Sequence, residues 1–253
     1  MKNVTLIIQG KVSQETLDFY TKNYPKLNVI ISTWVDNNLN LNNLPINYRL
    51  VCQPLPPKGG HQNQNYQFIS TLNGLYLSNT EYVIKIRGDE YYNNVEYILS
   101  QMEKNPNKVY SSPVFFRHWS FMKYHISDHI IAGTRQNLLT MFESARDKIA
   151  NGELYHIRNG EKLEYWEPEI NLTRAYLMEK EPDRYTTVDG RILMIDNFEI
   201  LNIDKMTPYK VVANIFKTTW KGGFIPERNY SISNIRKLLL SKDKAYDTDI
   251  TQG

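Results

Sequence analysis

The stretch VTLIIQG at residues 4–10 joins a short run of β-branched and aliphatic residues to a turn. The run at 4–8 has the length of a buried strand, and Ser13 follows as a possible cap for an amphipathic helix at about 14–23. A second β-branched run occupies residues 27–32. Strand, helix and strand in this order are typical of a βαβ unit. We therefore predict an α/β fold.

The same alternation continues along most of the chain. Further strands are predicted at 48–52, 81–86 and 108–116, and helices at 62–77, 95–104, 135–149 and 169–179. Beyond residue 185 we expect strands at 191–195 and 211–216, a helix at 233–240 and a frayed tail. No repeat or long linker divides the chain, so we expect one domain over residues 1–253.

The composition excludes several classes of protein. Of 253 residues, 41% are hydrophobic and 23% are charged, which is typical of a globular protein with a sizeable core. A formal net charge of +3 does not favour nucleic acid as a partner, and a single cysteine, Cys52, excludes a disulfide scaffold. No apolar run approaches the roughly 20 residues that cross a bilayer, and the opening run is too short for a signal peptide. We expect a cytoplasmic protein whose mature chain begins at Met1.

Residues that follow the predicted strands are the first candidates for a site, because ligands of parallel α/β sheets bind beyond the carboxyl ends of the strands. Four segments qualify: 9–10, 32–36, 87–90 and the polar segment 125–133. The first lacks the second and third glycines of a dinucleotide fingerprint, which disfavours a nicotinamide enzyme. No Walker-type lysine loop, nucleophile-elbow serine or His-Glu-Xaa-Xaa-His helix occurs, so ATPases, α/β-hydrolases and zinc proteases lose their main support.

An acidic pair, Asp89 with Glu90, follows the predicted strand at 81–86. A carboxylate at that place can hold a hard divalent cation, whose other positions take diphosphate oxygens and water. Such an ion neutralises the charge on a departing nucleoside diphosphate. An aspartate after a strand also serves as a turn former or a helix cap, and the pair alone does not separate these roles.

Several longer motifs occur in a fixed order. They are LIIQG at 6–10, ISTW at 31–34, NQNYQ at 63–67 leading to Ser70-Thr71, Gly74-Leu75, YVIKIR at 82–87 with Asp89, and HISD at 125–128 followed by Gly133. In this combination the chain resembles the WavE family of lipopolysaccharide-synthesis glycosyltransferases over roughly residues 4–140. The last hundred residues match loosely, through Pro168-Glu169 ahead of a helix.

The resemblance implies a GT-A-like, Rossmann-related fold, in which helices flank a mostly parallel twisted sheet. It also implies a nucleotide-sugar donor and a surface-polysaccharide product. We expect a nucleotide-sugar half at about 1–110, an acceptor half at about 111–230, and a C-terminal helix and tail at about 231–253. The chain departs from the Asp-Xaa-Asp motif common in GT-A enzymes, because Arg87 stands where the first aspartate would be.

The donor site is expected at the ends of the early strands. The candidate donor-binding residues are Gln9, Gly10, Thr33, Asp36, Asn63, Asn65, Lys85, Arg87 and Asp89. The residues at 9, 33 and 36 would face the nucleoside, and the two cations the diphosphate. Asp89, with Glu90 as a weaker second, would bind Mn²⁺ or Mg²⁺, or Asp89 would contact the ribose-phosphate region directly. Loop hydrogen bonding, a polar sheet edge and helix capping are the structural alternatives.

A base is needed if the reaction inverts the anomeric centre, and a carboxylate with a modestly raised pKa suits that purpose. By analogy with inverting GT-A enzymes, which carry an acid at the start of a late helix, Glu169 is the first candidate and Asp128 the second. Either could instead be a helix-end carboxylate that favours the dipole. His125 would orient the substrate or make a structural hydrogen bond.

Together these features predict a glycosyltransferase that moves a sugar from a nucleotide-sugar donor to a growing surface glycan, such as lipopolysaccharide or capsule. The acceptor would be a glycan or a lipid-linked glycan. Residues 233–244 mix leucines with basic residues and would allow at most a peripheral contact with the inner face of a membrane. A noncatalytic glycan-binding module and a nucleotidyltransferase are the alternatives; the latter needs triphosphate-binding glycines and basic residues early in the chain, which are not evident.

Overall fold

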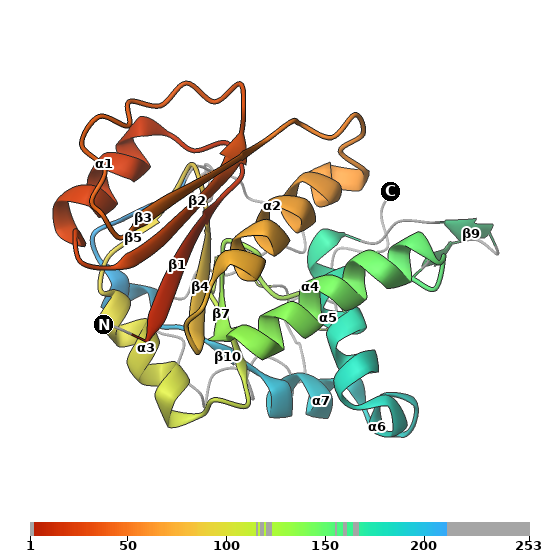
Figure 1. Ribbon diagram of the computed structural model, residues 1–253. Helices are drawn as coiled ribbons and strands as arrows, with labels where there is room; N and C mark the ends of the chain where they lie inside the picture. Colours follow the sequence, from red (N-terminus) through yellow and green to blue (C-terminus); the bar gives the residue numbers. More distant parts are fainter. Residues whose placement is uncertain are drawn as a thin grey trace, which may run out of the picture.

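A mixed seven-stranded sheet in the order β10-β6-β7-β4-β1-β2-β3 forms the centre of the protein (Figure 1). The computed structural model describes residues 3–114, 116, 119, 123–154, 156–158, 161–163 and 167–211. The strands of the sheet are β1 (Val4–Gln9), β2 (Asn28–Trp34), β3 (Tyr48–Gln53), β4 (Tyr82–Arg87), β6 (Val109–Ser111), β7 (Ile130–Thr134) and β10 (Phe198–Ile200). Neighbouring strands are parallel except at β7, which is antiparallel to β4 and β6. The predicted fold class is confirmed: the protein has an α/β fold with a mostly parallel sheet, consistent with a GT-A-like architecture.

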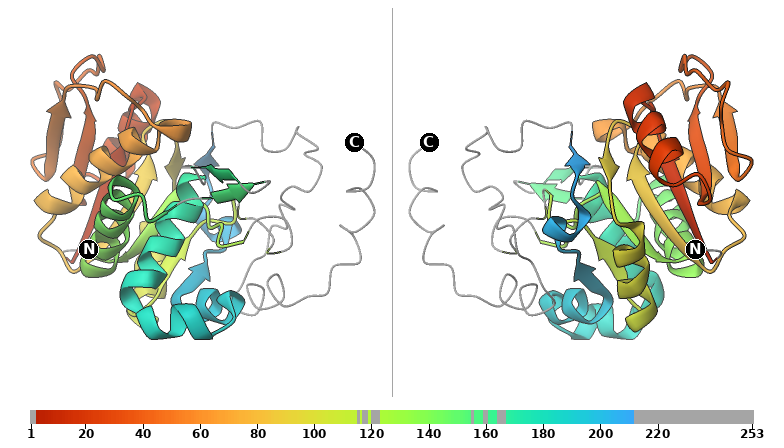
Figure 2. Two further views of the ribbon diagram at one scale, coloured as in Figure 1. Left: turned by 90° about the vertical axis from the view of Figure 1, so that its right-hand side faces the viewer. Right: turned by 90° about the vertical axis from the view of Figure 1, so that its left-hand side faces the viewer.

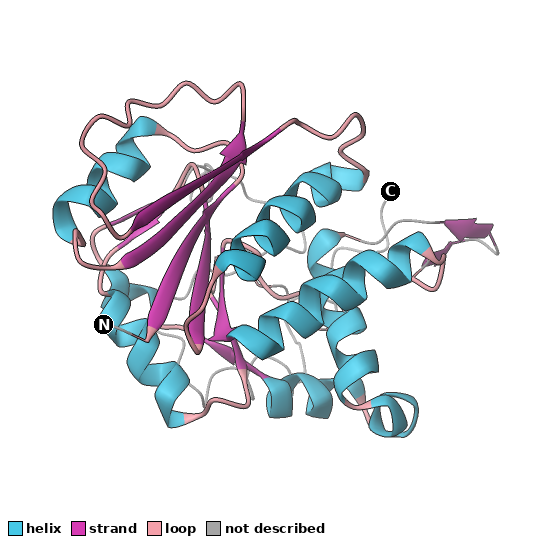
Figure 3. Cartoon of the chain, in the orientation of Figure 1, coloured by secondary structure: helices cyan, strands magenta, loops and turns pink. Residues whose placement is uncertain are grey.

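Helices cover both faces of this sheet (Figures 2 and 3). One face packs against α1 (Gln14–Asn23) and α3 (Val95–Lys104), and the other against α2 (Gln64–Leu77), α4 (Arg135–Ala150), α5 (Pro168–Lys180) and α7 (Gly190–Asn197). The shorter elements are η1 (His61–Asn63), α6 (Pro182–Thr187), η2 (Ile203–Met206), the pair β5 (Tyr91–Tyr92) and β11 (Tyr209–Lys210), and the pair β8 (His156–Arg158) and β9 (Glu161–Leu163). Among the described helices, none is long and apolar enough to cross a membrane.

β1 lies among the parallel strands and is buried along its whole length. Its side chains alternate between the two helical layers: Leu6 and Ile8 pack with α1 and α3, whereas Ile7 packs with α2. Gly74 lets α2 approach this strand closely, because a Cβ there would lie 2.6 Å from the Ile7 side chain. Burial on both faces explains why the strand is a continuous apolar run in the sequence.

The strand predicted at 191–195 is wrong, because these residues belong to α7. The carboxylate of Asp189 accepts a hydrogen bond from the backbone N–H of Arg191 at 2.8 Å and so caps the helix. Ile192 is exposed, whereas Leu193 and Met194 are both buried. Two consecutive buried residues are incompatible with the one-sided alternation of an exposed strand and fit a helical face.

Two other expectations need correction. The strand predicted at 108–116 is limited to β6, and Pro113, which has no N–H to donate to a ladder, follows shortly after it. β7 and β10 lie in segments for which no strand was predicted. All but Val211 of the strand predicted at 211–216, together with the helix at 233–240 and the proposed membrane contact at 233–244, lies outside the described residues. The single domain over 1–253 and its two halves stay a prediction.

Candidate active site

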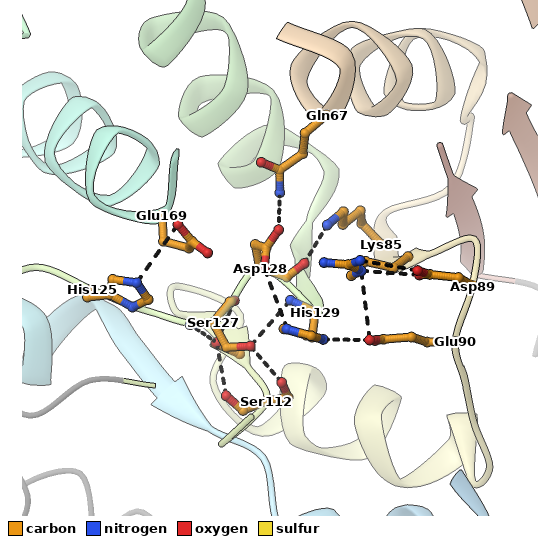
Figure 4. A network of polar contacts seen from close by, with 12 residues as sticks. Gln67, Lys85, Asp89, Glu90, Ser112, His125, Ser127, Asp128, His129 and Glu169 are labelled. Carbon is orange, nitrogen blue, oxygen red and sulfur yellow. Dashed lines mark hydrogen bonds and ion pairs between the residues drawn. The ribbon is translucent and has the colours of Figure 1, made fainter. Parts of the chain in front are cut away.

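Segments from distant parts of the chain meet at the carboxyl edge of the sheet (Figure 4). β4 ends there at Arg87 and leads into residues 88–90. β7 runs against β4, so its start lies at the same edge and brings residues 125–129 next to the end of β4. The first turn of α5 contributes Glu169, and the first half of α2 contributes Gln67. The reversal of β7 is what joins these segments in one site.

Asp128 lies at the centre of the group (Figure 4). Its Oδ2 accepts a hydrogen bond from Gln67 Nε2 at 2.8 Å, and its backbone carbonyl accepts one from the Lys85 ammonium. Burial by itself would raise the pKa of this carboxyl, but the charges of Lys85, His129 and Arg87 together lower it below its ordinary value. Asp128 is therefore an ionised carboxylate at neutral pH.

Glu169 lies close to Asp128, and its pKa is shifted in the opposite direction. Burial raises the pKa of Glu169 to about 8, and the negative charge of Asp128 adds to the effect. His125 Nε2 lies 3.8 Å from Glu169 Oε2, within ion-pair distance when the imidazole is protonated. Two carboxyls whose surroundings push their pKa values apart can divide a reaction between an electrostatic role and a proton-transfer role.

Lys85 does not face open space in the structure, so its contact with a diphosphate stays a prediction that its burial does not favour. Its side chain is fully buried, and this burial lowers the pKa of the ammonium against the opposing charge of Asp128. A buried cation needs hydrogen-bond partners, and the Asp128 carbonyl is one of them. The structure gives Lys85 a supporting position behind Asp128.

Arg87 and Asp89 form a partly exposed pair at the end of β4. Nε and Nη2 of Arg87 donate to the two carboxylate oxygens of Asp89, each at 3.2 Å. The side chains keep 38% and 34% of their surface exposed, so a ligand can reach either of them. At this end of β4, where a donor diphosphate was expected, the carboxylate of Asp89 holds the guanidinium of Arg87 in place.

Glu90 is fully buried, and both of its oxygens have partners. Oε1 lies 2.7 Å from His129 Nδ1, and Oε2 accepts a hydrogen bond from the Tyr92 hydroxyl at 2.8 Å. In the part of the chain that the structure describes, no three His, Cys, Asp or Glu side chains are grouped so as to hold a metal ion. A divalent cation takes six or more oxygen ligands, several of them from carboxylates or water. Glu90 is enclosed and Asp89 is held by Arg87, so the two do not fit the expected Mn²⁺ or Mg²⁺ site.

The family model for WavE lipopolysaccharide synthesis matches residues 4–171, more than half of the chain. The chain belongs to the WavE lipopolysaccharide synthesis family. The resemblance carried by the motifs over residues 4–140, which include Asp128, is thereby confirmed, and the match extends beyond them to Glu169. No curated protein matches the chain. Family membership connects this WavE protein with the synthesis of lipopolysaccharide.

The expected nucleoside contacts of the WavE protein are divided between the two faces of the sheet. Gln9 ends β1 on the face that α2 covers and is paired with Arg87 in the register of the sheet. Thr33 is buried on the opposite face, and Asp36 is exposed in the turn after β2. Gly10 begins the turn after β1 with a φ of 90°. The structure therefore places Gln9 beside Arg87 in the sheet, whereas Thr33 and Asp36 lie apart from Arg87.

Asn63 and Asn65 lie at the start of α2, against the Gly59-Gly60 turn. Asn63 occupies the N-cap position with a φ of 62° and makes no side-chain capping bond. Asn65 Nδ2 donates to the carbonyl of Lys58 at 3.3 Å, and a Cβ on Gly59 would lie 2.6 Å from Asn63 Oδ1. Asn65 thus ties the turn to the helix, and both side chains stay at least partly exposed. Contact with the sugar donor stays a prediction for both.

Among the buried polar residues of the WavE site, Gln64, Gln67, His129 and Asn171 were not candidates from sequence. Gln64 Oε1 accepts a hydrogen bond from Asn171 Nδ2 at 3.0 Å, which ties α2 to α5. His129 connects the enclosed Glu90 to Asp128, whose Oδ1 lies 4.0 Å from His129 Nε2. Gln64 and Gln67 are three residues apart on α2, and this spacing was a usable sequence signal that they share one face of the helix. His129 lies in the candidate segment 125–133, but no pattern singled it out, because β7 was not predicted.

Proposed function

We propose that this WavE protein is a glycosyltransferase that moves a sugar from a nucleotide-sugar donor to a growing surface glycan. The observation that carries the proposal is the pair Asp128 and Glu169, whose pKa values are shifted in opposite directions at the carboxyl edge of an α/β sheet. Membership in a lipopolysaccharide synthesis family supports a glycan or lipid-linked glycan as the acceptor. The reaction takes place on the cytoplasmic side, at or near the inner face of the membrane.

In the proposed reaction the acceptor hydroxyl attacks the anomeric carbon while the bond from this carbon to the donor phosphate breaks. Glu169 takes the hydroxyl proton, and its pKa of about 8 makes the ionised form a stronger base than an ordinary glutamate. Asp128, which stays ionised, stabilises the positive charge that develops on the sugar ring. Direct displacement of this kind inverts the anomeric configuration.

Several neighbours prepare these two carboxyls for their roles. Gln67 and Lys85 hold the side chain and the backbone of Asp128, respectively, so the carboxylate needs little reorganisation during the reaction. His125 lies beside Glu169 and stabilises the ionised form when it carries a proton. Arg87, which is accessible at the end of β4, faces the leaving group.

A transfer assay tests the proposal, with UDP-, GDP- and dTDP-sugars as donors and rough lipopolysaccharide as the acceptor. We expect one donor to release its nucleoside diphosphate together with an equal amount of glycosylated lipopolysaccharide, measured by mass spectrometry. Glu169→Gln removes both signals, whereas Glu179→Gln, at the exposed far end of α5, leaves them unchanged. The two substitutions are chemically identical, so the comparison isolates the position.

A thermal-shift measurement with the same ligands separates the enzyme from a binding module, because a ligand that binds the folded state raises the melting temperature. We expect stabilisation by a nucleotide sugar. Stabilisation by rough lipopolysaccharide alone, with no response to nucleotides and no transfer, would contradict the proposed activity and support a noncatalytic glycan-binding module.

A further inference from the structure

The end of β4 has an arginine at the position where an Asp-Xaa-Asp motif would have its first aspartate. A cation, Arg87, comes first, and the carboxylates of Asp89 and Glu90 follow. The guanidinium donates two hydrogen bonds to Asp89, each at 3.2 Å, and its Nε lies 3.7 Å from Glu90 Oε1. Both acids are therefore turned towards the arginine, which already occupies the position between them.

The two acids have little capacity left for a metal ion. Glu90 has no exposed surface, and its oxygens are engaged by His129 and Tyr92. Asp89 is accessible, but a cation bound to it would have to share its two oxygens with a guanidinium about 3 Å away. Two positive charges on one carboxylate repel each other. The end of β4 thus offers a metal ion little coordination, and the exposed part of its charged groups that could bind an anion is Arg87.

Arg87 also has the donors that a diphosphate needs. Of the two cations on this part of β4, Lys85 is enclosed and Arg87 keeps 38% of its side chain exposed. A guanidinium carries five N–H donors, and Asp89 takes two of them. The remaining donors lie in a fixed plane whose geometry suits bidentate binding of phosphate oxygens, and the group stays charged at every accessible pH.

We propose that Arg87 takes the place of a divalent cation in this protein, binding the diphosphate of the donor so that transfer proceeds with no resident metal ion. This inference rests on the proposed glycosyltransferase function. In the step that it describes, a bond forms between the acceptor oxygen and the anomeric carbon as the bond from that carbon to the phosphate oxygen breaks. The proton passes to Glu169, and the electron pair of the broken bond stays on the diphosphate beside Arg87.

Asp89 is a positioning residue in this arrangement, since it acts through Arg87. Its bidentate contact fixes the plane of the guanidinium and leaves the outer donors pointing away from the carboxylate. The role differs from that of a metal ligand in a measurable way. A metal ligand is required only when the ion is present, whereas a positioning carboxylate affects nucleotide affinity equally with and without the ion.

Isothermal titration calorimetry with UDP, GDP, ADP, CDP and dTDP tests the inference on the full chain, in EDTA and in Mg²⁺ or Mn²⁺. We expect one of these nucleotides to bind in EDTA with an affinity within about threefold of that measured with the metal. Arg87→Gln weakens binding by about 10- to 100-fold in either buffer, as expected for loss of charge-assisted hydrogen bonds. Arg87→Lys restores only part of the affinity, because lysine keeps the charge but lacks the planar fork.

Arg146→Gln is the matched control, because Arg146 is a half-exposed arginine that pairs with its neighbour Asp147 on α4. Its nucleotide affinity should equal that of the wild type. Circular dichroism melts show which variants are folded, and if Arg87→Gln is not folded, Arg87→Lys and Asp89→Asn carry the comparison. We expect Asp89→Asn to weaken binding by the same factor in both buffers.

The outcomes separate this inference from the proposed function. Binding that requires Mg²⁺ or Mn²⁺ and is lost in Asp89→Asn would overturn the inference and leave the glycosyltransferase standing. Binding in EDTA that Arg87→Gln and Arg87→Lys do not weaken would overturn it as well. If none of the nucleotides binds in either buffer, the nucleotide-sugar donor and the role of Arg87 are refuted together.

Discussion

Replacing Glu169 with glutamine tests the proposed base in the greatest detail. With a pKa of about 8, about 1% of the carboxyl groups are ionised at pH 6, about 9% at pH 7 and about 90% at pH 9. If only the ionised form accepts the proton, kcat/KM rises about tenfold from pH 6 to pH 7, about fivefold from pH 7 to pH 8, and then levels off. This profile follows from the burial of Glu169 and the nearby charge of Asp128.

Glutamine keeps the shape and the neutrality of the protonated acid but cannot accept the proton. We therefore expect Glu169→Gln to lower kcat by about 10²- to 10⁴-fold and to remove the rising limb from the residual activity. Glu179→Gln should retain the wild-type profile, because this side chain is exposed on the last turns of α5. The measurement is kcat/KM between pH 6 and pH 9.

The same variant has an effect on stability whose sign follows from proton linkage. Between its ordinary pKa of 4.5 and its folded pKa of about 8, Glu169 holds a proton in the folded state and not in the unfolded state. The free energy of unfolding of the wild type therefore falls as the pH rises through this window, whereas glutamine does not titrate. Glu169→Gln should match the wild type near pH 4 and exceed it by several kcal/mol at pH 9.

Two results would refute this reasoning. A Glu169→Gln variant that keeps both the rate and the rising limb would show that another group accepts the proton, and Asp128 would become the first candidate. Equal urea denaturation midpoints for wild type and variant at pH 4 and pH 9 would show that the pKa of Glu169 is not raised in the folded protein.

Three further substitutions test the supports of the site. In Gly88→Ala the new Cβ would lie 2.7 Å from a backbone oxygen of the loop after β1, so we expect the free energy of unfolding in urea to fall by about 1–3 kcal/mol. Gly133→Ala is the control, because its Cβ would lie 3.4 Å from its nearest neighbour, and its stability should change little. Gln67→Leu removes the 2.8 Å hydrogen bond to Asp128, which should raise the pKa of the Asp128 carboxyl and lower the free energy of unfolding by about 1.5–3 kcal/mol. An NMR titration measures the pKa, and an unchanged titration would count against the contact. Lys85→Met leaves Asp128 without its main opposing charge and should lower stability by about 3–5 kcal/mol at neutral pH. The loss should be smaller in acid, where protonation of Asp128 removes the unpaired charge, and equal losses at neutral and acid pH would contradict this.

The early part of the fold was predictable because local signals and burial agree there. β1 is buried on both faces, so its apolar run has the length and composition of a strand, and Ser13 caps α1 through its hydroxyl, which accepts from the Thr16 N–H at 3.1 Å. The helix at 190–197 was mistaken for a strand because four consecutive apolar residues carry no period of their own. Its boundary is set by Asp189, a signal that is weaker than the apolar run.

The candidate site was predictable in its residue types and less so in its arrangement. Asp128 and Glu169 were singled out separately, but their proximity depends on β7 running backwards through the sheet, which no local pattern indicates. The positions of Lys85 and Arg87 differ for a similar reason. The alternation of side chains along a strand places both on one face of β4, yet only Arg87 extends past the core into an accessible position. Depth within the sheet comes from tertiary packing, and the spacing of charges does not encode it.

The reversed strand β7 has a consequence for how the polypeptide can be divided. A fragment that stopped at residue 110 would keep the neighbours β1, β2 and β3 but would expose the other flank of β4, where β7 now forms a ladder. An unprotected flank of this kind is a template for self-association, and the ammonium of Lys85 would lose the carbonyl it bonds to. Residues 1–110 are therefore not a self-sufficient unit, and a truncation or fusion of this chain has to retain β7 to keep both flanks of β4 covered.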